Sequence, residues 1–545
     1  MSLCSKLQVK LPEKGIIVVK SGKYPYVYHV DATYRNERGV PTNKKRSIGK
    51  LDNHSGMLIP NKTYYEIYEG QAEVIIEPSA NESMVSYGEV RTIGIFAVVN
   101  AIFDKLGLAR ILTSIVGQKR YQLILTVAAY MLSEGNVMQY IDDFCENNLF
   151  GKGISDWETS KLFASLSNAE RMKFFKGWVE LNIQNEYIAY DVTSFSTYAK
   201  NMDDAEYGYN RDRESLPQIN MALYMGQTSL LPMFYVTYNG SIVDKSHLEY
   251  MMAYNEELGI ENVSFVMDRG FATTDNAEYM RSKGYPFILG AGVSLKAIQQ
   301  AFAENKPGVE DAKNYILDEK VYGLAIKGRF YRIAATLHVF YDPESISKQT
   351  ADFFRKIAVE EQELSQLKCL DDAQLKRYSK HFVIKKTENG FSFERDNDKI
   401  NGVRERLGYF FILTNKDFSP AEVVKIYRKR DVIEKGFDEI KNGLDMNRLR
   451  THSSQTTDGK MFCAFLSLIC RLHMQNKLKK FMDEHNFSNE RIIRELSKIR
   501  AIEVGAQKRL LNPLTKIQKD MLYALGLDKN FFSNFVISLI ISLNL

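Results

Sequence analysis

The change of hydrophobic period between residues 186 and 292 constrains the fold more than any other feature of this sequence. Three stretches rich in β-branched and aromatic residues follow one another with short turns, EYIAYDVTSF, QINMALYMG and LLPMFYVTYNG. This pattern is typical of an antiparallel meander. A helical stretch then precedes the strand-like VSFVM, and a second one precedes FILGAG. The order of three strands, helix, strand, helix, strand predicts an α/β core.

The flanking segments predict further domains, because a chain of 545 residues is too long for one compact core. Residues 1–89 contain strand-like GIIVVK, YPYVYHVDATY, KRSIGKL and YYEIY and form a β-rich N-terminal module; residues 90–185 have a helical period. The core comprises residues 186–292 and 408–480, with a mixed, strand-rich subdomain inserted at 293–407, and residues 481–545 predict a helical C-terminal tail, a candidate for dimerisation.

Cysteine usage and hydropathy indicate a cytoplasmic protein with no membrane partner. The five cysteines form no CxxC pair, which favours free thiols in a reducing compartment. Residues 1–14 have no apolar segment of the kind found in secretion signals. The apolar runs 462–470 and 535–543 are too short to span a bilayer, so we expect them to form buried helices.

Positive charge is concentrated at the N-terminus. Residues 1–50 hold eleven Lys or Arg and three acids, a net charge of +8, whereas the whole chain carries +5. A basic module on a nearly neutral body predicts a polyanionic partner such as DNA. A basic surface without a ligand is the alternative that charge alone leaves open.

Two aspartates stand where predicted strands of the core meet a possible ligand site. Asp191 follows the apolar YIAY of the first strand, and Asp268 ends the strand VSFVM, directly before Arg269 and Gly270. An aspartate at the end of a strand in an α/β sheet can lie at the crevice where ligands bind. Each aspartate, taken alone, is equally compatible with capping a turn.

The stretch YRKRDVIEKGFDEIK, residues 427–441, predicts a helix with a polar stripe next to its apolar face. Projected at about 100° per residue, Tyr427, Arg430, Glu434 and Lys441 fall within one stripe. The neighbouring stripe carries Phe437 and the isoleucines 426, 433 and 440, and is suited to packing on the sheet. Salt-bridged surface decoration would give similar spacing, and Gly436 in mid-helix costs about 1 kcal/mol relative to alanine.

Three carboxylates with basic side chains beside them suit metal-assisted phosphodiester chemistry. Mg²⁺ prefers oxygen ligands and keeps positions open for phosphate. Two such ions can activate a water or hydroxyl and stabilise the leaving oxygen. Asp191 and Asp268 from neighbouring strands and Glu434 from a packed helix could hold them, while the tyrosine, arginine and lysine of the stripe grip flanking phosphates.

The spacing Y-x2-R-x3-E-x6-K, filled by Tyr427, Arg430, Glu434 and Lys441, resembles the signature of DDE transposases of bacterial insertion sequences, of the insertion-sequence family 4 type. Asp191 in YDVTSFS and Asp268 in VMDRGF resemble the first and second catalytic aspartates of that family, and Glu434 its glutamate. The N-terminal stretch YPYVYHVDATYRNERGVPTNKKRSIGKLD resembles the opening of one subgroup.

The resemblance implies an RNase H-like core with an insertion before the helix that carries the glutamate. It implies Mg²⁺-dependent cleavage at the ends of an insertion sequence and attack of the freed 3′-OH on target DNA, with no covalent protein–DNA intermediate. Two Mg²⁺ ions, or Mn²⁺ in their place, would bind Asp191, Asp268 and Glu434. Tyr427, Arg430 and Lys441 would bind DNA. The implied partners are double-stranded DNA, as terminal inverted repeats and as target, and a second copy in a synaptic homodimer at the bacterial nucleoid.

Two other functions remain open at this point. One is a domesticated or inactive transposase that binds DNA without cutting it, and the other is a nuclease of the same core fold that does not transpose. Ser194 and Ser196 lack a G-x-S-x-G context and an evident histidine partner. His247, His452 and His473 are isolated in the sequence, whereas a metal site needs several converging ligands.

Overall fold

A computed structural model describes most of the chain, in two compact units of residues 1–86 and 87–545. The residues that it describes are 9–21, 24–36, 39–52, 56–68, 90–148, 153–183, 186–199, 202–243, 248–260, 263–293, 295–387, 390–504, 508–528 and 531–532. Within them, no helix combines the length and the apolar character needed to cross a bilayer. Cys4, His247 and the apolar run 535–543 lie outside the described residues.

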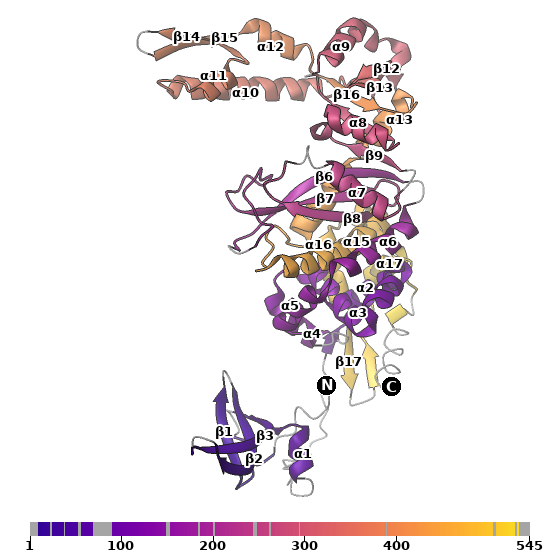
Figure 1. Cartoon of the computed structure of the whole chain (residues 1–545). Coiled ribbons are helices and arrows are strands. Elements are labelled where there is room, and N and C mark those ends of the chain that lie inside the picture. Colours follow the sequence, from indigo (N-terminus) through magenta and orange to yellow (C-terminus); the bar gives the residue numbers. More distant parts are fainter. Residues whose placement is uncertain are drawn as a thin grey trace. The chain divides into compact units, whose positions relative to one another are not determined.

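The N-terminal unit is an antiparallel sheet with one short helix (Figure 1). Its elements are β1 (Ile16–Ser21), β2 (Tyr24–Arg35), β3 (Pro41–Leu51), β4 (Leu58–Pro60) and α1 (Lys62–Tyr68). The prediction of a strand at YYEIY is wrong, because this stretch is the helix α1. In the helix Tyr64 stacks on Tyr68, four residues away and therefore on the same helical face, and Tyr64 joins Val27 and Ile48 in the small core of the unit.

Helices precede the main sheet, as their apolar period predicts. They are α2 (Gly94–Lys105), α3 (Leu108–Glu134), the 3₁₀ turn η2 (Met138–Tyr140), α4 (Ile141–Asn147), α5 (Asp156–Ser165) and α6 (Asn168–Asn182). A capping box begins α6, with Ser167 accepting a hydrogen bond from the Glu170 N–H and the Glu170 side chain accepting one from the Ser167 N–H.

The main sheet has nine strands in the order β11-β12-β13-β16-β10-β9-β6-β7-β8. Its first part is formed by β6 (Tyr187–Ser196), β7 (Gln218–Gly226), β8 (Pro232–Asn239), β9 (Ser264–Met267) and β10 (Phe287–Ala291). The expected meander β6-β7-β8 is antiparallel, whereas β9 pairs in parallel with both β6 and β10. The helices α7 (Leu248–Glu257) and α8 (Thr274–Ser282) lie between the later strands in the sequence, and the 3₁₀ turn η4 (Arg269–Phe271) follows β9.

Residues 293–407 contribute both to this sheet and to a smaller cluster. The helix α9 (Lys296–Val309) and the 3₁₀ turn η5 (Ala312–Asn314) lead to β11 (Tyr315–Ile316), β12 (Val321–Phe330) and β13 (Ile333–Tyr341), which extend the main sheet beyond β16 (Tyr409–Thr414). The smaller cluster has its own apolar core, and Figure 1 shows its helices and hairpin side by side. It consists of α10 (Ile346–Gln366), α11 (Asp372–Tyr378), β14 (Phe382–Thr387), β15 (Gly390–Arg395) and α12 (Asn397–Arg404).

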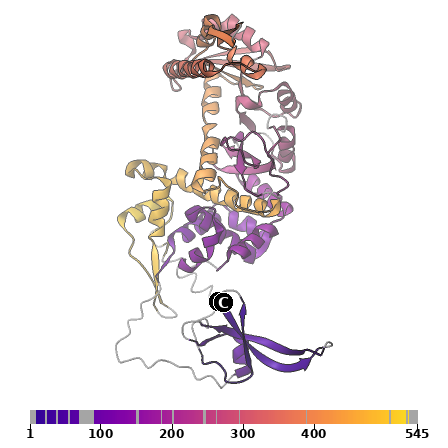
Figure 2. The same ribbon diagram turned by 90° about the vertical axis from the view of Figure 1, so that its left-hand side faces the viewer.

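The stretch predicted as one helix over residues 427–441 is divided into three pieces. The helix α13 (Pro420–Arg428) ends before Lys429, α14 (Asp431–Asp438) follows, and a π-helical turn, η6 (Glu439–Gly443), completes the segment. Hydrogen bonds of the i to i+3 type, from the N–H of Arg430 to Tyr427 and of Ile433 to Arg430, tighten the junction of α13 and α14. The orange helices α13 and α14 run along one side of the sheet (Figure 2).

One face of the sheet carries Asp191 and is covered by these helices. Asp191 pairs with Leu223, which pairs with Tyr235, so the three side chains share a face. Gly436 of α14 packs on Leu223, and Phe465 of α15 (Ser454–His485) packs on Tyr235. On the opposite face, Tyr224 donates a hydrogen bond to the Met251 carbonyl of α7.

The C-terminal segment is not wholly helical, so that prediction is wrong for part of its length. It contains α16 (Asn489–Ser497), α17 (Lys516–Ala524) and the hairpin of β17 (Arg500–Val504) and β18 (Lys508–Leu511). The hairpin forms a three-stranded sheet with β5 (Val90–Thr92), which lies some 400 residues earlier in the chain. A strand whose partner is so distant carries little local signal of its own.

Candidate active site

Asp191 and Asp268 lie on adjacent parallel strands at the same level. Tyr190 of β6 is in register with Met267 of β9, and each aspartate is the next residue along its strand. Asp268 directly follows β9 and begins the turn η4. The two carboxylates therefore lie side by side on the face that α14 covers, although Asp191 is in the middle of β6 and only Asp268 stands at a strand end.

The Asp191 carboxyl is largely shielded from water. Its side chain is 22% exposed, and burial raises its pKa to about 6, with the negative charge of Asp268 adding to the effect. The Val192 N–H, which donates a hydrogen bond to Asp191 Oδ1 at 2.8 Å, acts in the opposite direction, as do the nearby charges of Arg211 and Arg430. A cation placed next to such a carboxylate would favour its charged form and lower its pKa.

Tyr427, near the end of α13, contacts the second aspartate, Asp268. Its hydroxyl donates a hydrogen bond to Asp268 Oδ1 at 3.3 Å. A Cβ added at Gly290 of β10 would lie 2.5 Å from that hydroxyl, so the absence of a side chain at position 290 makes room for the tyrosine. Burial, together with the Asp268 charge, raises the pKa of Tyr427 to about 12, and the phenol remains protonated at neutral pH.

Arg430 lies between two of the candidate carboxylates. Its guanidinium is 3.7 Å from Asp191 Oδ2 and donates a hydrogen bond of 2.8 Å to Glu434 Oε1. The Arg430 side chain is only 16% exposed, whereas that of Glu434 is 60% exposed. Glu434 thus extends toward water, and the arginine supplies positive charge beside Asp191.

Gly436 explains how closely α14 approaches the sheet. A Cβ at this position would lie 3.3 Å from Met225 Sδ and 3.4 Å from Leu223 Cδ2, both on β7. The glycine that weakens the helix in the sequence therefore allows it to pack directly on the strand next to β6. Glu434, two residues earlier on α14, is hydrogen-bonded to Arg430, which also lies beside Asp191.

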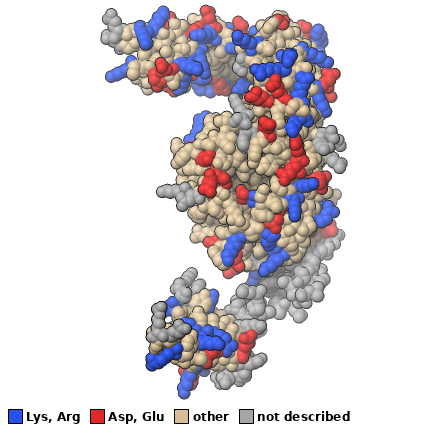
Figure 3. All heavy atoms as spheres, in the orientation of Figure 1, with Lys and Arg blue, Asp and Glu red and all other residues tan. Residues whose placement is uncertain are grey.

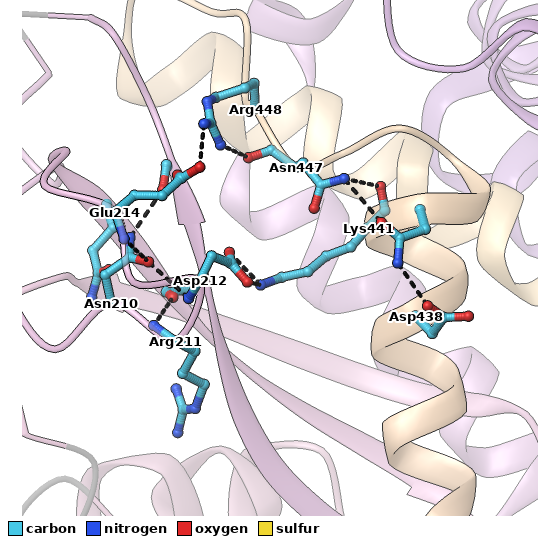
Figure 4. Close-up of polar contacts among 12 residues, drawn as sticks. Asn210, Arg211, Asp212, Glu214, Asp438, Lys441, Asn447 and Arg448 are labelled. Carbon is cyan, nitrogen blue, oxygen red and sulfur yellow. Dashed lines mark hydrogen bonds and ion pairs between the residues drawn. The ribbon is translucent and has the colours of Figure 1, made fainter. Parts of the chain in front are cut away.

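Lys441 is separated from the other five candidate residues. It lies in the π-helical turn η6, is buried, and places its ammonium 5.7 Å from the centre of the Phe195 ring. Its Nζ donates hydrogen bonds of 2.9 and 2.7 Å to the two carboxylate oxygens of Asp212 (Figure 4). Asp212 belongs to the loop 197–217 between β6 and β7.

A second ion pair holds the same loop. Arg448 donates a hydrogen bond to Glu214 and another to the Asn447 carbonyl (Figure 4). The loop is fixed from within as well, because the Asn210 side chain accepts hydrogen bonds from the Asp212 and Glu214 N–H groups. The sequence-based prediction did not include Asp212 and Glu214. The segment GYNRDRESLPQ, which alternates basic and acidic residues, could have indicated a charge-paired loop.

The carboxylates fit a divalent cation by donor type, with one rearrangement required. Asp191 and Asp268 offer hard oxygen ligands side by side, and burial raises the pKa of Asp191 even though Arg430 lies 3.7 Å from its Oδ2, so a cation bound directly to this carboxylate would favour its charged form. In the part of the chain that the structure describes, no three His, Cys, Asp or Glu side chains are grouped as a metal site. Glu434 would have to leave Arg430 to become the third ligand.

The remaining sequence candidates have structural partners. The buried Ser194 and Ser196 hydroxyls accept hydrogen bonds from the Arg211 N–H and the Asn210 side chain. His473 is buried, and burial lowers its pKa to about 4, with the charges of two neighbouring lysines adding to the effect. His452 is exposed. These residues carry no further site.

Comparison with known proteins gives one family match. A model of the transposase DDE domain matches residues 184–470, more than half of the chain, and this range contains all six candidate residues. The chain is also similar to a solved piggyBac transposase synaptic complex with hairpin DNA, at 9% identity and a TM-score of 0.36 over 82% of each chain. No curated protein matches the sequence.

Proposed function

Because the chain belongs to the transposase DDE domain family, we propose that it is an active DNA transposase. It cuts DNA at the ends of an insertion sequence and joins the freed 3′-OH to target DNA. The observation that carries this proposal is the register of β6 and β9, which sets Asp191 beside Asp268 on the face covered by the helix of Glu434.

The strand order supports an RNase H-like core for this activity. Strands β8, β7 and β6 form an antiparallel meander, and β9 and β10 continue from β6 in parallel. We propose residues 186–292 and 408–480 as this core, 293–407 as its insertion, 90–185 as a helical domain, 481–545 as a dimerisation segment and 1–89 as a DNA-binding module. The boundaries follow the changes of sequence period.

Asp191, Asp268 and Glu434 are proposed as ligands of two Mg²⁺ ions, for which Mn²⁺ can substitute. Bound there, the ions would lower the pKa of an attacking water or 3′-OH and stabilise the negative charge of the leaving oxygen. A bound cation would favour the ionised form of Asp191 beside Asp268, in addition to the positive charge that Arg430 supplies. No residue of this group is placed to form a covalent bond with DNA in the proposed mechanism.

The basic residues around the carboxylates position the DNA backbone. With Glu434 as a metal ligand, Arg430 would be released from it and could bind a phosphate, because the guanidinium matches two phosphate oxygens. Tyr427 remains protonated and can donate its hydroxyl to a phosphate oxygen near Asp268. Lys441, farther along the helical segment, contacts the strand beyond the cut.

The proposed partners are double-stranded DNA, both as terminal inverted repeats and as target, and a second copy of the chain. A pair of protomers would hold the two ends of one element together, as in the insertion-sequence family 4 type that the Y-x2-R-x3-E-x6-K signature resembles. The basic N-terminal unit supports a role in binding the ends. The bacterial cytoplasm, at the nucleoid, is the corresponding location.

The test uses the purified full chain, Mg²⁺ or Mn²⁺, and DNA that carries the inverted repeats flanking the gene. Asp191→Asn, Asp268→Asn and Glu434→Gln should each abolish cleavage and strand transfer while retaining DNA binding. Asp438→Asn, an exposed carboxylate on the same helix, is the matched control and should cut normally. Three variants that cut as well as the parent chain would refute the assignment.

The products separate the proposed function from its two alternatives. Cleavage together with joined target DNA identifies a transposase, and cleavage without joining under all conditions identifies a nuclease. Binding without cleavage with either metal identifies an inactive DNA-binding descendant.

A further inference from the structure

The strands β2 and β3 continue beyond the rest of the N-terminal sheet as a two-stranded ribbon. β1 pairs with β2 only up to His29, and β4 pairs with β3 only from Gly49 onward. Residues 31–35 and 41–46, which we call the ribbon, pair only between β2 and β3 among the described residues, and Lys45 and Arg46 pair with Val30 and His29 at its base. They are exposed, apart from the half-buried Thr42, and bury no apolar core.

The base of the ribbon is fixed, so that its direction from the unit is defined. His29 Nδ1 and the Tyr68 hydroxyl of α1 are 2.6 Å apart, and the Val30 N–H donates to the Gly15 carbonyl at 2.8 Å. Asp31 is the extra residue of a β-bulge, and its carboxylate accepts hydrogen bonds from Arg46 at 2.6 and 3.0 Å. A bulge increases the right-handed twist of a strand pair.

One face of the ribbon presents hydrogen-bond donors at regular intervals. Lys45, Asn43 and Pro41 alternate along β3, and the pairs of Thr33 with Asn43 and of Arg35 with Pro41 bring two more side chains to this face. We call Arg35, Thr33, Asn43 and Lys45 the donor face. Thr33 donates its hydroxyl hydrogen to Asn43 Oδ1 at 2.8 Å, which orients the amide so that its NH₂ group points away from Thr33.

The charge of this region suits a polyanion. Lys44 and Lys45 form no ion pair with any residue that the structure describes. Figure 3 shows Lys and Arg side chains gathered over the visible face of the N-terminal unit. The Lys45 ammonium lies over the Tyr28 ring, with Nζ 4.7 Å from the ring centre. Apart from the exposed Tyr34, residues 31–35 and 41–46 carry no large aliphatic or aromatic side chain, so the ribbon gains little by packing against another protein.

We propose that the ribbon inserts into the major groove of double-stranded DNA with its donor face toward the base edges. The major groove, about 12 Å wide, admits a two-stranded β-ribbon. Side chains two residues apart on a strand are separated by about 6.8 Å, which matches two base-pair steps of about 3.4 Å. Asn43 and Lys45 would therefore contact base pairs two steps apart, and the ribbon would cover about six base pairs.

This inference rests on the proposed function for the identity of the DNA, which would be the end of the element. Binding is measured by fluorescence anisotropy with the full chain, without divalent metal, so that cleavage does not enter. The probes are a 40-base-pair duplex taken from the DNA adjoining the gene and a random duplex of equal length and composition, about six ribbon footprints long.

Lys45→Ala should weaken binding to the adjoining duplex by about fivefold or more, whereas Lys45→Arg should retain it. The matched control is Lys20→Ala, which removes an equal charge from an exposed strand residue of the same unit, outside the ribbon. It should change the affinity less than about twofold. Asn43→Ala should reduce the preference for the adjoining duplex over the random one. Equal losses for Lys45→Ala and Lys20→Ala would overturn the proposal.

The groove is identified separately. Replacing guanine by 7-deazaguanine removes a major-groove acceptor without disturbing base pairing, and it should weaken the parent chain more than Asn43→Ala. Distamycin, a minor-groove ligand, should compete poorly, and methyl green, a major-groove ligand, should compete well. Strong competition by distamycin and weak competition by methyl green would overturn the proposal. The mass of the ribbon variants is also measured by light scattering. A variant whose mass changes while its DNA affinity does not would overturn the proposal as well, because the ribbon would then pair with a second copy.

Failure of the two proposals can be told apart. A chain that binds through the ribbon but never cuts DNA refutes the transposase and leaves the ribbon assignment intact. A chain that cuts and joins DNA while Lys45→Ala and Asn43→Ala bind as tightly and as selectively as the parent refutes only the ribbon.

Discussion

Lys441 and Asp212 form a bidentate ion pair across 229 residues of sequence, with N–O distances of 2.7 and 2.9 Å. Lys441 is a proposed phosphate contact, and its partner is a carboxylate of the loop between β6 and β7. The neighbouring Arg448 forms an ion pair with Glu214 of the same loop through one carboxylate oxygen. The carboxylates of this loop therefore pair with Lys441, the proposed phosphate contact, and with Arg448.

Asp212→Asn should increase DNA affinity, because it removes an internal competitor for Lys441. We expect binding of a 40-base-pair duplex at 0.1 M salt to tighten about three- to tenfold, or ~1 kcal/mol. Asp438→Asn removes an equal charge from the nearby helix, where its partner is the neutral Asn442, and serves as the control. Titrations in which the two variants bind with equal affinity would contradict this role of Asp212.

Gly290→Ala should disturb the site through Tyr427. The added Cβ would lie 2.5 Å from the Tyr427 hydroxyl and 2.9 Å from the Arg269 backbone nitrogen, so the tyrosine must move away from Asp268. Overpacking of this kind costs about 1–3 kcal/mol, and cleavage should fall in parallel. Thermal unfolding and DNA cleavage are the two measurements.

The comparison variant is Gly402→Ala, in the exposed helix α12, where an added Cβ meets nothing within 4 Å. Alanine is the better helix former there, and stability should rise by about 0.5–1 kcal/mol with cleavage unchanged. If Gly290→Ala behaved like Gly402→Ala, the packing of Tyr427 over β10 would have no bearing on the site.

The α/β order of the core was predictable because its strands are buried and rich in apolar residues, although β6 and β7 are joined by the loop 197–217 and not by a short turn. The runs YIAY, NMALYM and SFVM are mostly apolar, and Asp191 and Asp268 interrupt or end such runs, which indicated them as candidate site residues. The caps at Ser167 and Ser419 were predictable for a related reason, since both motifs are complete within four residues.

Lys441 could not be placed correctly from the sequence. A projection at a constant angle assumes an unbroken helix, whereas this segment tightens around Arg430 and widens in the π-helical turn that contains Lys441. Its pairing with Asp212 depends on a loop more than 200 residues away. Long-range pairing also explains why β17 and β18 were missed. YYEIY, rich in strand-forming residues, was misassigned because packing of Tyr64 against Val27 and Ile48 outweighs its strand propensity.

Arg471→Met should strongly destabilise the main unit. Arg471 contacts Glu439, the first residue of the π-helical turn η6. The Nη2 of Arg471 also lies 2.9 Å from Glu490 Oε1. Removing one partner of a buried ion pair leaves an uncompensated charge and costs about 3–5 kcal/mol. Urea unfolding followed by the fluorescence of Trp178, which is fully buried, gives the value.

The double variant Glu439→Gln with Arg471→Met should recover part of that loss, since neither buried charge then remains. Asn489, which donates to Glu439 Oε1 at 2.6 Å, can still donate to the glutamine oxygen. A double variant less stable than Arg471→Met alone would show that the charge of Glu439 is not the source of the loss.

Lys460→Met should abolish the rise in the free energy of unfolding that Lys460 causes as the pH increases above neutrality. Lys460 is 2% exposed and donates hydrogen bonds to the Asn136 carbonyl, the Asn136 side chain and the Leu449 carbonyl. Burial lowers its pKa to about 7, and the charge of Arg450 adds to this effect. In the unfolded chain the lysine keeps its proton to about pH 10.4.

Between these two values the unfolded state binds more protons than the folded state, so this residue makes the free energy of unfolding rise with pH. The slope for one proton approaches about 1.4 kcal/mol per pH unit. Urea unfolding at pH 7.5, 8.5 and 9.5 should show the parent chain gaining stability relative to Lys460→Met at each step. A constant difference between the two proteins over this range would mean that Lys460 remains protonated in the folded state, held by its three oxygen acceptors.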